Sequence, residues 1–365
     1  MRIKPLRDRI RKVLVLFGTG WRSMREIIIT SNDAGRRLDR FLRKYLPGAS
    51  LGEVYKIIRK DAKVDSKRRS ESYILNEGET LSLYLSDDTL AAFGAPGPAA
   101  AKRPVRHSAA KRSFGIVYED ENILIADKPY GLLTHGDSHE KKNHLANQVK
   151  DYLIASGAYD PRNERVFTPA PANRLDRNTT GVVLFGKTSS AMRELNRMIR
   201  EDDIRKFYYT IACGIIKGDM HLGGSLVKDE AANKVSILND DSGKDIETIV
   251  RPLEVLTFGS GLKATLCEVE LVTGRSHQIR AHLDNAGHPL IGDSKYATRD
   301  AAGVNAYVRK RFGLTTQLLH ADRIEFLDLA AGSESLGYLA ERCFDAPLPK
   351  RFREILTGLG GKNRY

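Results

Sequence analysis

The sequence has few cysteines and no long hydrophobic run, and both facts exclude classes of protein. Among its 365 residues are three cysteines, Cys213, Cys267 and Cys343, and none has the spacing of a metal site. Three widely separated cysteines are typical of a reduced protein, and we expect a cytoplasmic location. The longest strongly apolar run near the start, 13–17, is far too short to span a membrane.

Positive charge is concentrated in the first third of the chain. Residues 1–113 contain 25 Lys and Arg against 12 Asp and Glu, whereas the other residues contain 34 of each. This excess accounts for the whole net charge of +13. It predicts that the first third binds a polyanion, with nucleic acid the leading candidate.

The basic third divides into three expected parts. Residues 1–30 form a basic extension, of which residues 1–23 are expected to be disordered or weakly helical and 25–29 to form the first strand of a domain. Met24 is a hypothetical natural start, because a strand-like segment follows it; an intact mass that includes residues 1–23 would contradict this. Residues 31–86 contain two amphipathic basic helices followed by short strands, and residues 87–113 have the composition of a flexible basic linker.

A polar segment at 173–181 is the first candidate for a functional site. It reads Asn-Arg-Leu-Asp-Arg-Asn-Thr-Thr-Gly and places Asp176 between Arg174 and Arg177. Opposite charges nearby favour the ionised carboxylate, which is a poor general acid and a plausible nucleophile. A simple ion pair in a loop would give the same pattern, so this segment alone leaves both interpretations open.

Two further segments carry aromatic and basic residues in regular patterns. In the expected strand at 204–212, alternation places Phe207 and Tyr209 on one face and Tyr208 on the other, where an aromatic ring could stack on something flat. In 273–288, helical spacing places Ile279 on an apolar face and Arg280 on the opposite one. The plain interpretation of that opposite face is a solvated charged surface, and its histidines lack metal-ligand spacing, so we expect no metal.

Taken together, four motifs in a fixed order resemble the RluA family of pseudouridine synthases over residues 114–345. They are Asp-Lys-Pro-x-Gly at 127–131, Arg-Leu-Asp-x-x-Thr-Thr-Gly at 174–181, Lys-x-Tyr at 206–208 and Thr-Gly-Arg-Ser-His-Gln-Ile-Arg-x-His at 273–282. The resemblance implies an α+β catalytic fold with a mixed, mostly antiparallel central sheet and flanking helices. It also implies isomerisation of uridine to pseudouridine in RNA by a monomer without cofactor or metal, and leaves residues 346–365 as a basic tail.

The resemblance assigns roles to individual residues. Asp176 matches the catalytic aspartate of the family, and Arg280 matches the arginine that pairs with it. Tyr208 matches the tyrosine that packs on the target base. Arg174, Arg275 and Ile279 are the expected substrate-binding and base-flipping residues. The chain departs from the family at Asn173, where the family usually has histidine.

Residues 31–86 resemble the S-four-type RNA-binding domain, which is a small α/β domain. The similarity rests on Gly-Arg-Arg-Leu-Asp-Arg-Phe-Leu at 35–42, Ile-Ile-Arg-Lys at 57–60 and Asn-Glu-Gly-Glu-Thr-Leu at 76–81. Asp65-Ser66 replaces the usual Asn-Gly turn. The resemblance implies RNA contacts through Arg37, Arg40, Lys56, Arg59 and Lys60. With both domains, the expected substrate is large-subunit ribosomal RNA, with transfer RNA the alternative.

Two rival functions are considered. A non-catalytic RNA-binding or ribosome-assembly factor could keep the same fold; it would not need Asp176. A retaining glycosidase would need a second carboxylate close to Asp176, and Asp127 and Asp293 are the candidates.

Overall fold

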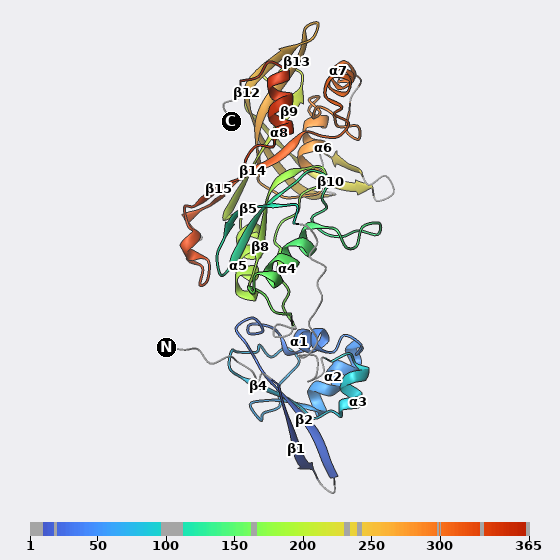
Figure 1. The fold of residues 1–365 in the computed structure, drawn as a ribbon, viewed down its shortest axis with the longest axis vertical. Helices are drawn as coiled ribbons and strands as arrows, with labels where there is room; N and C mark the ends of the chain where they lie inside the picture. The colour runs from blue at the N-terminus through green and yellow to red at the C-terminus, as the bar shows by residue number, and fades with distance from the viewer. Residues whose placement is uncertain are drawn as a thin grey trace. The chain divides into compact units, whose positions relative to one another are not determined.

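The computed structural model describes residues 10–17, 20–95, 112–161, 166–229, 234–238, 243–297, 299, 301–328 and 332–362. The chain divides into two compact units (Figure 1). The first contains residues 1–110, 150–169 and 187–190, and the second contains residues 111–149, 170–186 and 191–365. Within the described ranges, no helix has both the length and the apolar character that a membrane crossing requires.

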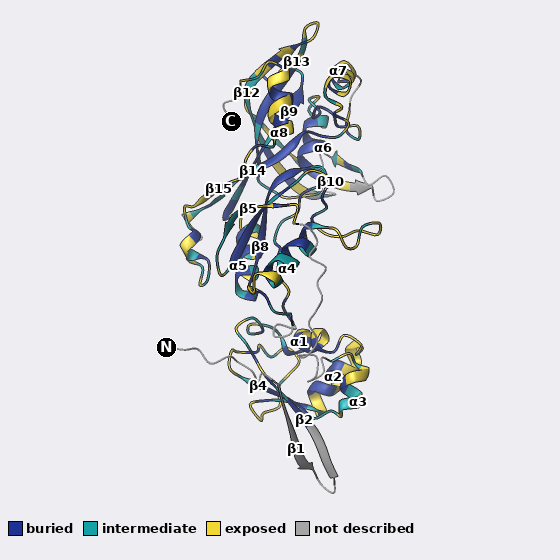
Figure 2. Cartoon of the chain, in the orientation of Figure 1, coloured by how far each residue is buried: buried dark blue, intermediate teal, exposed yellow. Residues whose placement is uncertain are grey.

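The first unit pairs a small antiparallel sheet with short basic helices. Its strands have the order β1-β2-β4-β3. Along the chain the elements are β1 (Ile10–Phe17), β2 (Gly20–Ile28), α1 (Leu38–Tyr45), α2 (Leu51–Lys60), β3 (Ala62–Val64), β4 (Thr80–Leu83) and α3 (Asp87–Ala92). Helices α1 and α2 each bury an apolar face and expose a charged one, as their periodicity predicts (Figure 2). A capping box between Ser50 and Glu53 starts α2.

The segment expected as a disordered or weakly helical extension is instead part of this sheet. Strands β1 and β2 pair from Ile10↔Ile27 to Phe17↔Gly20, and β2 continues onto β4. The expectation is therefore wrong for 10–17 and 20–23, whereas the strand expected from residue 25 is confirmed by β2. Alternating Val, Leu and Phe at 13–17 favour an extended chain, and pairing with β2 satisfies their backbone groups.

The turn after β3 keeps the geometry of an Asn-Gly hairpin although its sequence is Asp-Ser. Asp65 and Ser66 both have positive φ angles, 47° and 64°. The backbones of Val64 and Lys67 exchange two hydrogen bonds of 2.8 and 2.9 Å across it. Asp65 Oδ1 also accepts a hydrogen bond of 2.8 Å from the Thr80 N–H, which offsets the strain of a left-handed non-glycine residue.

The second unit is organised around an eleven-stranded sheet with the order β11-β10-β12-β13-β9-β14-β8-β6-β5. Strand β7 adds to β8 and β15 to β14. Its strands are β5 (Gly115–Glu119), β6 (Ile123–Lys128), β7 (Ala170–Pro171), β8 (Thr180–Gly186), β9 (Ile204–Cys213), β10 (Met220–Asp229), β11 (Lys234–Leu238), β12 (Lys244–Phe258), β13 (Leu262–Leu271), β14 (Leu319–Phe326) and β15 (Cys343–Asp345). Strands β14 and β8 run parallel, and the neighbouring described strands are antiparallel. The sheet is thus mixed and mostly antiparallel, as expected.

Helices contribute buried residues to the hydrophobic cores of this unit. They are α5 (Ser189–Arg200), α6 (Gln278–Asn285), α7 (Ala302–Phe312), a 3-10 turn η3 (Gly337–Leu339) and α8 (Lys350–Gly358). Helix α4 (Leu145–Ala155) begins in the second unit and ends in the first. Residues 346–365, expected as a basic tail, instead carry α8, whose Phe352, Ile355 and Leu356 lie in the core with β9, β12 and β13. Lys350, Arg351 and Arg353 lie on the exposed face of this helix.

Gly181 brings the start of β8 against β14. Its φ angle is 107°, and a Cβ atom at this position would lie 2.0 Å from the carbonyl oxygen of Ala321. Only glycine fits such an approach. Because β8 follows directly from the 173–179 segment, this junction fixes where that segment enters the sheet.

A pH-dependent effect is expected at Asp322 in β14. Burial, and then the charge of Asp345, raise the pKa of its carboxyl to about 6, above its ordinary value near 3.8. The folded state therefore holds the proton more tightly than the unfolded state, and stability falls as pH rises from about 4 through 6. Asp322→Asn mimics the protonated form and should raise the free energy of unfolding by about 1 kcal/mol at pH 7.5.

Denaturant titrations at pH 4.5 and 7.5 measure this effect. The gain should shrink at pH 4.5, where the wild-type carboxyl is largely protonated in the fold. The matched control is Asp328→Asn, at an exposed position, which should change stability by less than about 0.5 kcal/mol at both pH values. An equal gain at both pH values would contradict the assignment.

Candidate active site

The 173–179 segment is held in place by hydrogen bonds from the sheet. Asn173 Oδ1 accepts from the Leu184 N–H at 2.8 Å, and its Nδ2 donates to the Val182 carbonyl at 3.4 Å. The Thr134 hydroxyl donates to the Leu175 carbonyl at 2.9 Å and accepts from the Leu175 N–H at 3.1 Å. The asparagine that departs from the family pattern is therefore an anchor between this segment and β8.

Lys128 anchors the backbone of the same segment through a hydrogen bond to the Arg177 carbonyl. Its side chain is fully buried, and Nζ donates to the carbonyls of Pro129, Leu132 and Arg177 at 3.2, 2.7 and 3.0 Å. Burial lowers the pKa of Lys128 to about 7, against the opposing charges of Asp176 and Asp127. The three carbonyls match the three N–H groups of an ammonium and thus favour the charged form.

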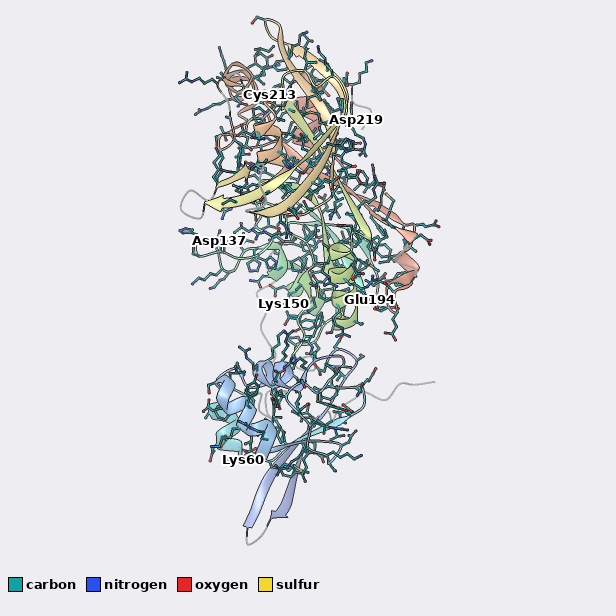
Figure 3. All side chains as sticks on the ribbon, turned by 180° about the vertical axis from the view of Figure 1, so that it is seen from behind. Lys60, Asp137, Lys150, Glu194, Cys213 and Asp219 are labelled. Atoms are coloured by element: carbon teal, nitrogen blue, oxygen red, sulfur yellow. The ribbon has the colours of Figure 1, made fainter. Side chains whose placement is uncertain are left out.

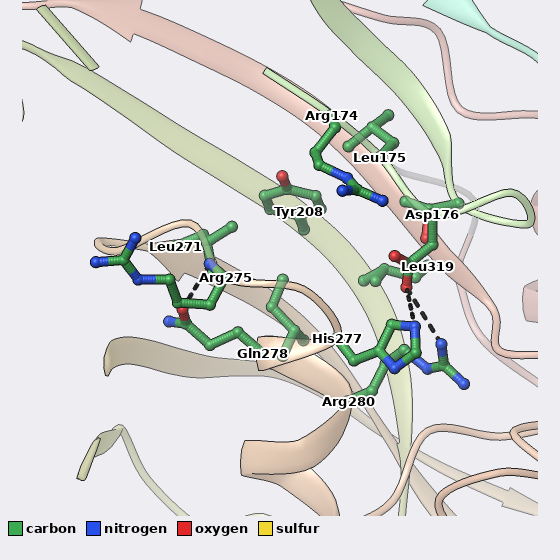
Figure 4. Close-up of a pocket in the computed structure, with 12 residues that line it drawn as sticks. Arg174, Leu175, Asp176, Tyr208, Leu271, Arg275, His277, Gln278, Arg280 and Leu319 are labelled. Atoms are coloured by element: carbon green, nitrogen blue, oxygen red, sulfur yellow. Dashed lines mark hydrogen bonds and ion pairs between the residues drawn. The ribbon is translucent and has the colours of Figure 1, made fainter. Parts of the chain in front are cut away.

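Asp176 is fixed by an arginine that is itself fixed by a second carboxylate. Arg280 Nη1 donates to Asp176 Oδ2 at 3.2 Å (Figure 4). Arg280 Nε and Nη2 donate to Asp293 at 2.6 and 2.9 Å. Asp293 is 1% exposed and also accepts from the backbone N–H groups of Lys295 and Tyr296. Burial alone would lower the pKa of Arg280, but the two carboxylates raise it, so the guanidinium stays charged.

Tyr208 forms a wall of the pocket that contains Asp176. It projects from β9 on the face opposite Phe207, as strand alternation predicts, and its ring lies in the pocket beside Arg174 (Figure 4). Burial, and then the charge of Asp176, raise the pKa of the Tyr208 hydroxyl, which keeps its proton at neutral pH. Phe207 instead packs under the guanidinium groups of Arg205 and Arg323.

Two hollows of different character meet at Asp176. The first is a small pocket with apolar walls, to which Leu175, Tyr208, Leu271, Ile279 and Leu319 contribute. The second is a larger polar cleft, to which His135, Asp137, Arg177, Ser276, Ser294, Lys295, Thr316 and Gln317 contribute. Arg174, Asp176, His277 and Arg280 line both. The arrangement suits a flat ring in the pocket and a charged sugar–phosphate chain in the cleft, with the carboxylate where they join.

The structure brings together most of the residues that the sequence analysis selected for the site. Asp176, Tyr208, Arg280, Arg174, Arg275 and Ile279 all line the apolar pocket. Arg177 is 51% exposed in its side chain and pairs with Asp137 at 3.5 Å, as expected for a solvent-facing arginine. Asp137 lies in the loop between β6 and α4 (Figure 3).

Some functional neighbours were not assigned a role from the sequence. They are Lys128, Thr134, His277 and Asp293, each within one or two contacts of Asp176. The motifs at 127–131 and 273–282 were visible signals for Lys128 and His277, whereas nothing in the sequence marks Thr134. The expected solvated face of α6 is wrong: residues 278–283 are buried on all sides.

The geometry answers the glycosidase alternative. Both oxygens of Asp293 are bound by Arg280, and Asp127 lines neither hollow. In the described part of the chain, neither of these two candidates therefore stands as a free second carboxylate beside Asp176. Those same ranges contain no group of three His, Cys, Asp or Glu residues placed to hold a metal ion.

Replacement of Lys128 tests its role as an anchor. Lys128→Met should lower the free energy of unfolding by about 2 kcal/mol, because three carbonyls lose their donor in a buried site. Activity should fall with it, since the Arg177 backbone is no longer held. Denaturant unfolding measures the free energy of unfolding, and a single-turnover assay measures the activity. The control is Lys142→Met, at an exposed position. A fully stable Lys128→Met protein would contradict this role.

Comparison with known proteins points to the same family as the motifs of the site. Residues 122–285 match the family model described as RNA pseudouridylate synthase. The chain is 31% identical over 317 residues to the ribosomal large subunit pseudouridine synthase C of Vibrio cholerae, covering 84% of this chain and 89% of that protein. It is 30% identical over 319 residues to the protein of the same name from Escherichia coli K12, covering 85% and 91%.

A solved structure supports the fold independently. Human RNA pseudouridylate synthase domain containing 4 superposes with a TM-score of 0.50 at 21% identity, covering 67% of this chain and 93% of that one. The motif order, the sheet that carries it and the similarity over most of the chain agree: this protein belongs to the RNA pseudouridylate synthase family and is an RNA pseudouridine synthase.

Proposed function

We propose that the protein isomerises specific uridines of large-subunit ribosomal RNA, with Asp176 as the nucleophile. The observation that carries the nucleophile is the Asp176 carboxylate, held by Arg280 at the junction of an apolar pocket and a polar cleft. The ribosomal substrate is supported by the names of the relatives, which share about 30% of their residues with this chain.

The reaction requires little from the protein besides position and charge. The bond from the ribose carbon to the ring nitrogen breaks, the base turns, and the same ribose carbon bonds to the fifth ring carbon, which loses its proton while the freed ring nitrogen takes one up. Nothing is oxidised or reduced and no atom is gained overall. A carboxylate that attacks and then leaves can keep one of the separated halves bonded to the protein, and Arg280 fixes the orientation of this carboxylate.

The pocket walls suit a uridine that has left its helix. Flipping a base out of the stack costs a few kcal/mol. Stacking on an aromatic ring returns roughly 1–3 kcal/mol, and Tyr208 offers that face. Arg174 is exposed at the rim of both hollows, where it can occupy the space that the base vacates or bind the flanking phosphate.

The first unit is proposed to bind RNA through its basic helices. Arg40, Lys56, Arg59 and Lys60 are exposed on α1 and α2, whereas the Arg37 guanidinium is paired with Asp39 at 2.8 Å. We therefore expect the first four to contact phosphates more strongly than Arg37. Through a tether, such contacts would raise the effective concentration of RNA at the neutral second unit.

The dependence of RNA affinity on salt concentration tests whether these helices bind the RNA. Replacing Arg40, Lys56, Arg59 and Lys60 with glutamine should reduce the slope of log affinity against log salt by about 3, because each lost phosphate contact removes about 0.7–0.9. The control replaces Lys350 and Arg353, two exposed cations of α8, with glutamine and should leave the slope nearly unchanged. Equal slopes for the wild type and the quadruple variant would contradict the proposal.

The substrate itself is tested directly. Purified protein is incubated with unmodified large-subunit ribosomal RNA and, separately, with transfer RNA, and carbodiimide-induced stops of reverse transcription are mapped. New stops in the ribosomal RNA alone are the expected result; stops only in transfer RNA would replace the proposed substrate. The monomeric state and the cytoplasmic location stay predictions.

A further inference from the structure

Tyr296 organises the side chains beside the catalytic pair. It is 1% exposed. Two cations lie over its ring: the guanidinium carbon of Arg280 is 4.9 Å from the ring centroid, and Lys234 Nζ is 5.0 Å from it. Its hydroxyl accepts a hydrogen bond of 2.8 Å from the Val235 N–H in β11. The same hydroxyl lies 3.1 Å from His277 Nδ1, and the two rings meet edge to face at 84°.

His277 is held in an unfavourable backbone conformation at the start of α6. Its φ and ψ angles are 57° and 14°, and its side chain makes no capping hydrogen bond to the helix. Such strain in a non-glycine residue persists only where the surroundings impose it, and it commonly marks a functional position. Here it places Nε2 3.8 Å from Asp176 Oδ2 (Figure 4).

The hydrogen bonds around Tyr296 favour one tautomer of His277. A backbone N–H can only donate, so the Tyr296 hydroxyl accepts from Val235 and has its own proton to give to His277 Nδ1. The ring proton then sits on Nε2, the nitrogen that faces Asp176. Arg280 and His277 both approach Oδ2 of Asp176, which leaves Oδ1 for the substrate.

We propose that His277 is a positioning residue for Asp176: its neutral ring, oriented by Tyr296, directs Nε2–H to Oδ2 and, with Arg280, selects Oδ1 as the attacking oxygen. The inference rests on the proposed function, in which Asp176 is the nucleophile. At 3.8 Å the contact is longer than a hydrogen bond, and catalytic contacts of this kind commonly tighten when substrate binds.

The charged surroundings favour the neutral ring at working pH. The groups that face His277 are Asp176, Asp293, Arg280 and Lys295, together with the Tyr296 hydroxyl. Burial is the largest influence and lowers the pKa of His277; the two cations lower it further, against the two carboxylates. When the ring is protonated in acid, it adds a second strong donor to Asp176 and weakens that carboxylate as a nucleophile.

Two substitutions separate positioning from folding. His277→Asn tolerates the left-handed backbone but its amide is too short to reach Asp176. His277→Gln carries an amide N–H about as far as Nε2 and cannot titrate. Single-turnover rates are measured with saturating large-subunit ribosomal RNA from pH 5 to 9, beside RNA affinity and the melting temperature.

The expected result is a rate about 10-fold to 100-fold lower for His277→Asn with unchanged RNA affinity. His277→Gln should recover most of the rate and lose one acid-side inflection of the wild-type pH profile. Tyr296→Phe should slow the wild type more than it slows His277→Asn, because it acts through the same ring. Full activity of His277→Asn, or a wild-type pH profile for His277→Gln, would overturn the inference.

The test also separates this inference from the proposed function. If Asp176→Asn abolishes the reaction while His277→Asn is fully active, only the role of His277 fails. If Asp176→Asn retains activity, the nucleophile itself is wrong, whatever the His277 variants do.

Discussion

Asp176→Asn is expected to abolish pseudouridine formation, with a single-turnover rate at least about 10⁴-fold below that of the wild type. The amide has nearly the same shape and can still accept from Arg280 Nη1 through its oxygen, so the pocket should keep its form. What it loses is the negative charge that attacks the substrate. RNA affinity should therefore change by less than about threefold, since the expected phosphate contacts and the stacking face of Tyr208 are unaltered.

Rate and affinity are measured on the same RNA, by quenched single-turnover reactions followed by carbodiimide mapping and by filter binding. The matched control is Asp219→Asn, an exposed aspartate just before β10, which should match the wild type (Figure 3). Residual activity above about 1% of the wild-type rate would remove Asp176 from the role of nucleophile. In cells, full complementation of a deletion by Asp176→Asn would show that a non-catalytic role in ribosome assembly is what the cell requires.

Gly181→Ala should destabilise the second unit by about 4 kcal/mol and inactivate the enzyme. The left-handed backbone costs about 1–2 kcal/mol for an L side chain. A methyl group 2.0 Å from the Ala321 carbonyl oxygen also forces β8 away from β14, at a cost of about 1–3 kcal/mol. Because the Asp176 segment enters the sheet at this glycine, the displacement reaches the carboxylate as well.

Gly261→Ala separates the cost of the positive φ angle from the cost of the close contact with β14. Gly261 has a similar φ angle of 98° in the turn between β12 and β13, but its Cβ would meet no atom within 4 Å. It should therefore cost only about 1–2 kcal/mol and leave the reaction rate unchanged. Chemical denaturation of both variants gives the comparison. Similar losses for the two would mean that the β8–β14 approach relaxes without cost.

Much of the site followed from short-range patterns in the sequence. Strand alternation correctly separated Tyr208 from Phe207, and helical spacing correctly predicted a helix within 273–288, where α6 lies. The polarity of 173–179 marked a segment outside the core. The convergence of Asp176, Tyr208 and Arg280 from three distant segments needed the family resemblance, because no spacing rule joins residues on different strands and helices.

The errors and omissions have a common physical origin in tertiary contacts. Helical spacing alone left a solvated face open for Arg280, because its buried partner, Asp293, lies in a loop beyond the helix. The conformation of His277 cannot be read from its neighbours, since a positive φ angle at histidine is imposed by Tyr296 and α6 rather than favoured locally. The hairpin at 10–28 is stabilised by pairing with β4, more than fifty residues later.

Arg280 uses one edge of its guanidinium for Asp293 and another atom for Asp176, and this has a consequence for how the gene can change. A lysine at position 280 could satisfy one carboxylate but not both, and it would leave the other buried and unpaired. Loss of Asp293 alone would leave the buried Arg280 guanidinium with a single carboxylate contact, to Asp176. Positions 280 and 293 should therefore covary. Among descendants of this sequence, a viable replacement at one position should appear only together with a compensating replacement at the other.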